Sequence, residues 1–346
     1  MSIDLVLLCG FLGSGKTTLL VDWLRDPAAA NTGVIVNEVG EIGIDGAIIA
    51  NASDNVPMTM LANGCVCCSL RSDLVHTLSA LLDTRPLERV VLECSGLSRP
   101  GPIVASLADP ELARRGLRLT VVCTDDCTLD VDALAQTDEA MAQFAAAQRI
   151  VMTKTDRVSS QNLEARAARA AALNPLASVI ADADRASAVR AAFAPAVAAS
   201  DLAALAARML TTGARGLSHP RIHVMTARAR PGIGWTEFSE WLDDLAGLCG
   251  ERLLRLKAVV RVSDCAEPIL IQSVGTTFSE PQRLLRQPDA PGAIIVITRD
   301  IDAAQIRAAV PDGPVPIMIT EIAEPVSINS ITSITSPRGF PCTTRP

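Results

Sequence analysis

The residues best suited to chemistry lie near the start of the chain. Residues 10–17 read Gly-Phe-Leu-Gly-Ser-Gly-Lys-Thr, which matches the pattern G-x-x-x-x-G-K-[ST]. The glycines would let the backbone wrap a polyphosphate, while Lys16 would reach the β- and γ-phosphates and the Thr17 hydroxyl would bind Mg²⁺. The alternative is a chance glycine-rich turn. The pattern predicts a nucleotide-binding loop whose residues are Gly10, Gly13, Ser14, Gly15, Lys16, Thr17 and Thr18.

A second element would recognise the base of the nucleotide. Thr153 to Asp156 read Thr-Lys-Thr-Asp, where GTP-binding proteins with this loop usually carry Asn-Lys-x-Asp. A carboxylate at Asp156 would accept two N–H bonds from guanine that adenine cannot supply. The stem of Lys154 would cover the base, and Thr153 stands in the place of the usual Asn. A solvated turn capped by Asp156 is the alternative, and we expect GTP rather than ATP.

An acidic strand end and a polar loop complete the predicted nucleotide site. Glu93 ends the apolar stretch 90–92, and in P-loop NTPases an acidic residue there helps to hold Mg²⁺. Gly96 would let the backbone approach the γ-phosphate. The polar, glycine-rich residues 37–46 stand where such proteins carry a switch, although an ordinary connection has the same composition. The predicted catalytic residues are Lys16, Thr17, Glu93 and Gly96.

Cys65, Cys67 and Cys68 place three thiols within four residues. Thiolates at this density suit Zn²⁺, Cu⁺ or another thiophilic ion. A fourth ligand position is left for Glu38, Glu41 or water, and an open site of this kind suits a protein that must release its metal. A redox-active thiol pair at a helix N-terminus and incidental buried cysteines are the alternatives.

Lysine is rare in this chain. Lys16, Lys154 and Lys257 are its three lysines, and the other 28 of its 31 basic residues are arginine. A chain that otherwise uses arginine for positive charge is expected to keep lysine where a compact ammonium is required. Two of the three lysines fall in the motifs above, and the third lies outside them.

Composition excludes several classes of protein. The formal net charge of −7 argues against a nucleic-acid binder that works by neutralising phosphates. No apolar run is long enough for a membrane span. The apolar residues 3–9 are preceded by no basic leader and are interpreted as a core strand rather than a signal peptide, so we expect a cytoplasmic protein with reduced thiols.

The motifs require elements that position them. Short apolar runs alternate with stretches of helical spacing, which favours an α/β fold with a doubly wound, mostly parallel sheet. The alanine-rich residues 163–210 are expected to be helical. The predicted strands are 3–9, 34–36, 89–92, 119–123 and 149–152, and the predicted helices are 16–24, 70–82 and 133–147.

The pattern changes near residue 221. Short connections between apolar runs indicate antiparallel strands in a smaller α+β domain. Its predicted strands are 221–226, 253–262, 269–274 and 293–298, and its predicted helices are 234–248 and 303–310. We therefore expect a P-loop GTPase domain over 1–212, an α+β domain over 219–320 and a poorly ordered tail over 325–346.

Taken in order, the motifs resemble those of the CobW-type metallochaperone GTPases, relatives of the GTPases that insert nickel into hydrogenase and urease. The resemblance rests on G-F-L-G-S-G-K-T-T-L-L, V-N-E-V-G-E-I-G-I-D, G-C-V-C-C-S-L and E-C-S-G-L. Further similar stretches are Leu173-Asn174-Pro175, Leu254 to Lys257 and Ile271 to Val274. The C-V-C-C stretch distinguishes the CobW group, while the His-rich segment of many members is missing.

This resemblance implies GTP hydrolysis with Mg²⁺, binding of a transition metal and its delivery to a client metalloprotein. It implies that Cys65, Cys67 and Cys68 are metal ligands and that Glu38 or Glu41 assists them. Zn²⁺ is the expected metal, with Co²⁺ or Fe²⁺ as alternatives, and a homodimer is a further expectation. Two other functions stay open at this point, namely a P-loop kinase for a small molecule and a non-enzymatic metal-binding or thiol-redox module.

Overall fold

The structure of the protein is a computed structural model. This structure describes residues 3–36, 57–60, 70–129, 137–195, 221–284, 292–309 and 320–321. The predicted transition-metal ligands, the 37–46 loop, the expected domain boundary between 212 and 219 and the expected tail all lie outside these ranges. No helix within them is long and apolar enough to cross a bilayer.

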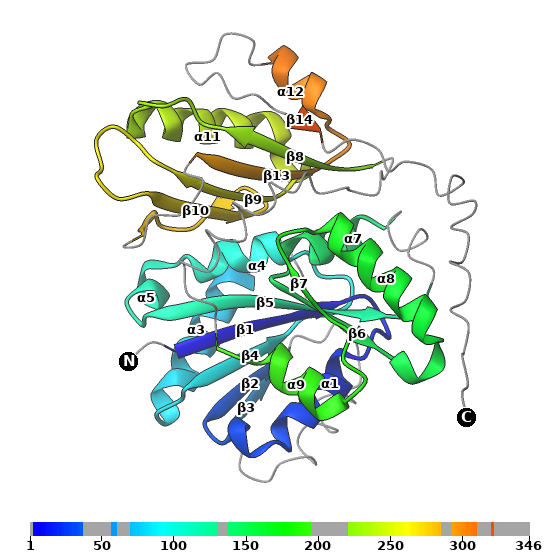
Figure 1. Cartoon of the computed structure of the whole chain (residues 1–346). Helices are drawn as coiled ribbons and strands as arrows, with labels where there is room; N and C mark the ends of the chain where they lie inside the picture. Colours follow the sequence, from blue (N-terminus) through cyan, green and yellow to red (C-terminus); the bar gives the residue numbers. More distant parts are fainter. Residues whose placement is uncertain are drawn as a thin grey trace, which may run out of the picture.

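Seven parallel strands form the first sheet, in the order β3-β2-β4-β1-β5-β6-β7 (Figure 1). β1 lies at the centre between β4 and β5, and its residues are almost entirely buried. Burial on both faces explains why these strands read as continuous apolar runs. The strands are β1 (Ile3–Gly10), β2 (Thr32–Val36), β3 (Met58–Met60), β4 (Arg89–Glu93), β5 (Leu117–Asp126), β6 (Arg149–Thr153) and β7 (Ser178–Ile180).

Helices cover both faces of this sheet. One face packs on α1 and α9 through a cluster that includes Leu20, Trp23 and Phe193. The other face packs on α3, α4, α5, α7 and α8. The helices are α1 (Lys16–Leu24), α3 (Leu70–Thr84), α4 (Pro100–Leu107), α5 (Pro110–Ala113), α7 (Asp138–Ala146), α8 (Ser160–Leu173) and α9 (Arg185–Ala192).

The second unit is an antiparallel sheet in the order β11-β10-β9-β13-β8-β14, with β12 paired to β10. The helix α11 (Trp235–Cys249) covers one face through Phe238, Trp241 and Leu245. The remaining elements are β8 (Ile222–Arg228), β9 (Leu253–Val260), β10 (Ile269–Val274), β11 (Thr277–Phe278), β12 (Gln282–Arg283), β13 (Ala293–Arg299), α12 (Ala303–Ala309) and β14 (Thr320–Glu321). The predicted doubly wound sheet followed by a smaller α+β unit is confirmed.

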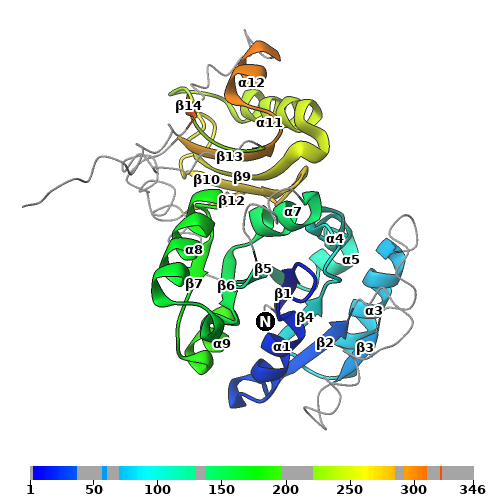
Figure 2. The same ribbon diagram turned by 90° about the vertical axis from the view of Figure 1, so that its right-hand side faces the viewer.

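The other face of the second sheet lies against the first unit, as Figures 1 and 2 both show. Ile295 and Ile297 of β13 pack there with Met141 and Ala145 of α7 in one buried cluster. The helix α7 therefore belongs to the core of the first unit and to the contact between the two units.

Two predicted helices differ from the observed ones. The helix predicted over 133–147 begins at Asp138, because Thr137 has an extended backbone and is its N-cap. The helix predicted over 163–210 is interrupted, because Asn174 is not helical, Pro175 follows it and the β-branched pair at 179–180 joins the sheet as β7. Residues 196–220 are outside the described ranges.

Candidate nucleotide site

The glycine-rich loop joins the central strand β1 to the helix α1, as the motif requires. Gly10, Gly13 and Gly15 all have a positive φ that other residues rarely adopt. A Cβ on Gly10, where φ is 145°, would lie 2.0 Å from Thr124 Oγ1, and Gly15 is the left-handed N-cap of α1 with φ of 91°. The loop thus leads directly into a helix N-terminus, where N–H groups and the helix dipole favour an anion.

Lys16 is 9% exposed and folds back over the loop. Its Nζ donates to the carbonyl oxygen of Gly10 at 2.9 Å and to that of Phe11 at 3.3 Å. These neutral acceptors satisfy the ammonium without neutralising it. Its positive charge is therefore available to a phosphate at the same loop.

Thr17 and Glu93 meet although they are far apart in the sequence. The Thr17 hydroxyl donates to Glu93 Oε1 at 2.7 Å, and Glu93 is 3% exposed at the end of β4. The pairing of Leu8 with Glu93 between β1 and β4 creates this proximity. One hydroxyl and one carboxylate are the oxygen donors that a hard divalent cation such as Mg²⁺ takes, so these residues fit Mg²⁺.

The segment after Glu93 lies directly against the glycine-rich loop. A Cβ on Gly96 would stand 2.7 Å from the backbone nitrogen of Leu12, so this approach requires glycine. The fully buried Gln143 of α7 holds the segment from behind. Its Nε2 donates to the carbonyl oxygens of Gly96 at 3.0 Å and Ser98 at 2.8 Å.

The base-recognition element adjoins the same loop. The Thr153 hydroxyl lies 2.7 Å from the carbonyl oxygen of Ser14 and 3.1 Å from that of Asp125, so it links β6 to the loop in the place of the usual Asn. Lys154 has a left-handed backbone with φ of 54° and forms an ion pair with Asp126 at 2.5 Å. Asp156 is exposed in the short 3-10 turn Thr155–Arg157.

The ion pair with Lys154 favours the charged form of Asp126. Burial would raise the pKa of Asp126, but hydrogen bonds from Lys154 and Thr128 outweigh burial and lower it. The neighbouring Asp125 pairs with Arg166 of α8 at 2.6 and 2.9 Å, and both side chains are almost fully buried. The carboxyl end of β5 thus carries two carboxylates, each with its own cation.

Sequence reasoning missed several of these contributors. Thr124 lies 2.7 Å from the Ser14 hydroxyl, Gln143 holds the segment after Glu93, and Arg166 pairs with Asp125. None belongs to a local motif, and their partners lie 41 to 110 residues away in the chain. The one usable signal is a polar residue in an otherwise alanine-rich stretch, which is too common to be specific.

The predicted thiol site lies outside the described residues, as do Cys65, Cys67, Cys68, Glu38 and Glu41. Within the described ranges no three His, Cys, Asp or Glu side chains are grouped so that they could hold a metal. Of the cysteines that the structure describes, Cys9, Cys94, Cys123, Cys127 and Cys249 are buried, whereas Cys265 is partly exposed.

Three of these cysteines lie side by side. Cys9 of β1 is paired in register with Cys123 of β5, and Cys94 directly follows the strand on the other side. A hydrogen bond from the Cys9 thiol to Cys94, together with burial, raises the pKa of Cys9 well above its usual value, and burial does the same for Cys123. The thiols of Cys9 and Cys123 are therefore protonated and poor nucleophiles.

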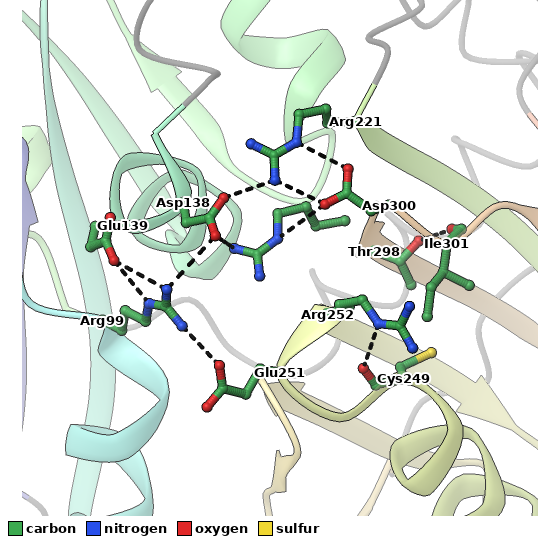
Figure 3. A network of polar contacts seen from close by, with 11 residues as sticks. Arg99, Asp138, Glu139, Arg221, Cys249, Glu251, Arg252, Thr298, Asp300 and Ile301 are labelled. Carbon is green, nitrogen blue, oxygen red and sulfur yellow. Dashed lines mark hydrogen bonds and ion pairs between the residues drawn. The ribbon is translucent and has the colours of Figure 1, made fainter. Parts of the chain in front are cut away.

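A network of ion pairs joins the site to the second unit (Figure 3). Arg99 follows the segment held by Gln143 and pairs with Glu139 at 3.1 Å and with Glu251 of the second unit at 2.9 Å. Asp138, at the first turn of α7, pairs with Arg221 at 2.9 Å and Arg299 at 3.0 Å. The residues that the first unit contributes to this network therefore belong to α7 or to the segment beside it.

Comparisons with known proteins agree with this arrangement. Residues 4–181 match the family model described as the CobW/HypB/UreG nucleotide-binding domain, and residues 222–312 match the cobalamin synthesis protein cobW C-terminal domain. The chain is 36% identical over 184 residues to the zinc chaperone YjiA of Escherichia coli (strain K12). That alignment covers 51% of this chain and 57% of the relative.

A longer alignment reaches the zinc chaperone CobW of a Sinorhizobium species, with 27% identity over 353 residues, 89% of this chain and 96% of the relative. The crystal structure of Zn(II)-bound YjiA GTPase from E. coli is similar in fold. Its TM-score is 0.59 at 22% identity, and the similarity covers 89% of this chain and 98% of that one.

Proposed function

The chain belongs to the CobW/HypB/UreG family, and from that premise we propose that it is a GTP-hydrolysing metallochaperone that carries zinc to a client metalloprotein. It is a P-loop GTPase of the CobW type. Its relatives YjiA and CobW are named zinc chaperones, which supports zinc as the cargo. The proposal adds that the nucleotide state controls the affinity for the metal.

The observation that carries the GTPase part of the proposal is the contact between Thr17 and Glu93. A hydroxyl and a buried carboxylate meet 2.7 Å apart beside a loop built for phosphates. Bound by these two side chains, Mg²⁺ would offset the negative charge on the β- and γ-phosphate oxygens. No intrinsic arginine finger is evident in the sequence. We therefore expect GTP hydrolysis without a partner to be slow.

The remaining residues act on the nucleotide directly. Lys16 would exchange its two carbonyl acceptors for phosphate oxygens and stabilise charge in the transition state. The backbone at Gly96, held by Gln143, would sense the γ-phosphate. Asp156 would accept the two N–H bonds of guanine, while Lys154 covers the base and Thr153 keeps β6 against the loop.

The metal site of this proposal rests on the sequence. Cys65, Cys67 and Cys68 bind zinc with Glu38 or Glu41 as an additional ligand. These residues lie between the glycine-rich loop and Glu93 in the sequence, so a switch loop that responds to the γ-phosphate would also affect the thiols. By linkage, the metal then changes the affinity for the nucleotide by the same factor.

We propose the division of the chain as residues 1–212 for nucleotide and metal and residues 219–320 for the second unit. The client, the cytoplasmic location and a homodimer stay predictions. The Trp-containing helix α11 and the exposed strands of the second unit are the surface that we assign to client contact, by analogy alone.

Nucleotide preference separates this function from a small-molecule kinase. Hydrolysis of GTP and of ATP should be measured with the purified chain and with Asp156→Ala. We expect a large preference for GTP in the parent that falls by roughly 10²-fold or more in the variant, because the carboxylate is the group that adenine cannot satisfy. Equal rates with ATP, or phosphate transfer to a small acceptor, would contradict the proposal.

A further inference from the structure

The third lysine of the chain is buried where the second sheet faces the first unit. Lys257 and Arg255 lie two residues apart on β9, and each is 1% exposed. Residues two apart in a strand point to the same face, with their Cα atoms about 7 Å apart. Two cations therefore share one buried face of the sheet.

Strand register identifies the neighbours of these cations. Lys257 lies between Gln272 of β10 and Ile295 of β13, and Arg255 lies between Val274 and Ile297. The isoleucines pack on α7, and Arg255 Nη1 donates to the carbonyl oxygen of Ala146, the last residue of α7. This face is consequently enclosed by the first unit.

The part of the chain that the structure describes supplies no anionic partner for this pair. Among the residues that the structure describes, no carboxylate pairs with either cation and no acceptor receives a hydrogen bond from Lys257. Arg255 Nε and Gln272 Oε1 are buried and also make no hydrogen bond. Burial and then the charge of Arg255 lower the pKa of Lys257 to about 7, and burial lowers the pKa of Arg255 to about 10.

We propose that Lys257 and Arg255 form a binding site for a small oxyanion, of the class of inorganic phosphate or a simple carboxylate, between the second sheet and the first unit. An isolated buried charge is costly, whereas one that is paired and hydrogen-bonded is tolerated. An oxyanion would accept from the Lys257 ammonium and from Arg255 Nε, for which the described residues supply no acceptor. The Gln272 amide, whose oxygen and nitrogen can exchange places, could donate as well.

Residue types in this chain favour the same conclusion. The protein uses arginine for 28 of its 31 basic residues. A core that needed only volume at position 257 would be served by an apolar residue, and often with a gain in stability. Lysine at this position instead supplies a compact charge with three donors, which suits a small anion in a confined space.

The three lysines make a direct measurement practical. The full chain is labelled with ¹³Cε-lysine and held with excess GDP and Mg²⁺, so that the glycine-rich loop is occupied before any other anion is added. The Lys257 signal is assigned by its loss in Lys257→Met. Inorganic phosphate is then titrated, and chloride at matched ionic strength and acetate at matched concentration are titrated separately.

We expect a saturable shift of the Lys257 signal with phosphate, with no matching shift of Lys16 or Lys154. A shift with acetate as well would assign the broader carboxylate class to the site, whereas phosphate alone would restrict it. A Lys257 signal that does not move with either oxyanion, or that moves equally with chloride, would overturn the proposal.

Thermal unfolding gives a second readout that does not depend on the assignment. Phosphate stabilises most proteins slightly by exclusion from their surface, so variants must be compared. Lys257→Met removes the proposed ligand group, and Arg261→Met removes one exposed charge just after β9 as the matched control. We expect the midpoint of the parent and of Arg261→Met to rise by about 2–4 °C more than that of Lys257→Met near saturation. Equal rises in all three proteins would contradict the site.

Discussion

Buried and partly buried cations are paired differently at the carboxyl edge of the first sheet and on the inner face of the second. At the first sheet, Lys16 is held by two carbonyl oxygens, Lys154 by Asp126 and Arg166 by Asp125. On the second sheet, Arg255 reaches one carbonyl oxygen, and Lys257 has no acceptor among the described residues. The cations of the first region are paired with acceptors of the chain itself. On the second sheet, the described residues supply no anionic partner for the positive charge.

The largest effect is expected from breaking a paired cation. Arg166→Ala leaves Asp125 buried without its partner, and removing one member of a buried pair typically costs about 3–5 kcal/mol. Chemical denaturation should therefore show a large loss in the free energy of unfolding. The control is Arg185→Ala, which breaks an exposed pair with Asp22 and should cost less than about 1 kcal/mol. Similar losses in both variants would mean that the network of the first region is not special.

Next in size is the loss of the loop lysine. Lys16→Ala removes the charge that would stabilise the phosphates, and we expect GTP hydrolysis to fall by roughly 10²–10³-fold. Lys257→Met, which removes a lysine of equal charge on the second sheet, should leave the rate near that of the parent. Initial rates of phosphate release compare the two. A comparable loss in Lys257→Met would place the second sheet in the hydrolysis reaction and break the contrast.

Sequence reasoning predicted the positions of motif residues where each motif is local, and the roles of these residues stay predictions. The glycine-rich loop, Glu93, Gly96 and the element 153–156 were all predicted from short motifs, and each lies at the carboxyl edge of the first sheet. The alternation of apolar runs with helical spacing was also enough for the fold. Motifs of this kind can be recognised in the sequence because each one depends only on the end of a strand and the turn beside it.

Contacts between distant residues could not be predicted in the same way. Gln143 and Arg166 are recognisable only once α7 and α8 pack against the end of β5. The strand β7 was missed because the surrounding alanines favour a helix, and only its pairing with β6 stabilises it as a strand. The scarcity of lysine drew attention to Lys257. Its burial beside Arg255 became evident only from the register of β9 in the structure.

A smaller expected effect is a pH dependence of the free energy of unfolding, which arises from Lys257 on the second sheet. The pKa of Lys257 is about 7 in the folded protein and 10.5 in its ordinary range, so between these values the unfolded chain binds a proton that the folded protein does not. The free energy of unfolding should therefore rise with pH in this window, by up to about 1.4 kcal/mol per pH unit. Arg255 is the charged neighbour on the face. Of the helices that pack there, α4 contains no charged residue, and α7 carries Asp138 and Glu139 in its first turn.

The measurement is the difference between the parent and Lys257→Met. Denaturation at pH 7 and pH 9 in a buffer free of oxyanions should show that the free energy of unfolding of the parent rises relative to that of Lys257→Met, because the parent gains stability that the variant cannot gain. Buried thiols add an opposite slope to both proteins, and the difference cancels it. Parallel slopes for the two proteins would show that Lys257 keeps its ordinary pKa.

The smallest expected effect is at the contact between the units. Arg99 is about one third exposed and pairs with Glu139 and Glu251, so solvent screens its contribution. Arg99→Ala should lower the free energy of unfolding by less than about 1 kcal/mol, and the loss should diminish at high salt. A loss of several kcal/mol that is insensitive to salt would mean that this network contributes as the buried pair of Asp125 does.

The most direct test of the proposed function is GTP hydrolysis with and without one equivalent of Zn²⁺. The parent and a triple variant, Cys65→Ala with Cys67→Ala and Cys68→Ala, are measured side by side, with Co²⁺ and Fe²⁺ as further metals. If the thiols bind a metal that is linked to the nucleotide, Zn²⁺ changes the rate of the parent and leaves the rate of the variant unaltered. If no metal alters the rate and the variant matches the parent, the thiols are not linked to GTP and the metallochaperone proposal fails.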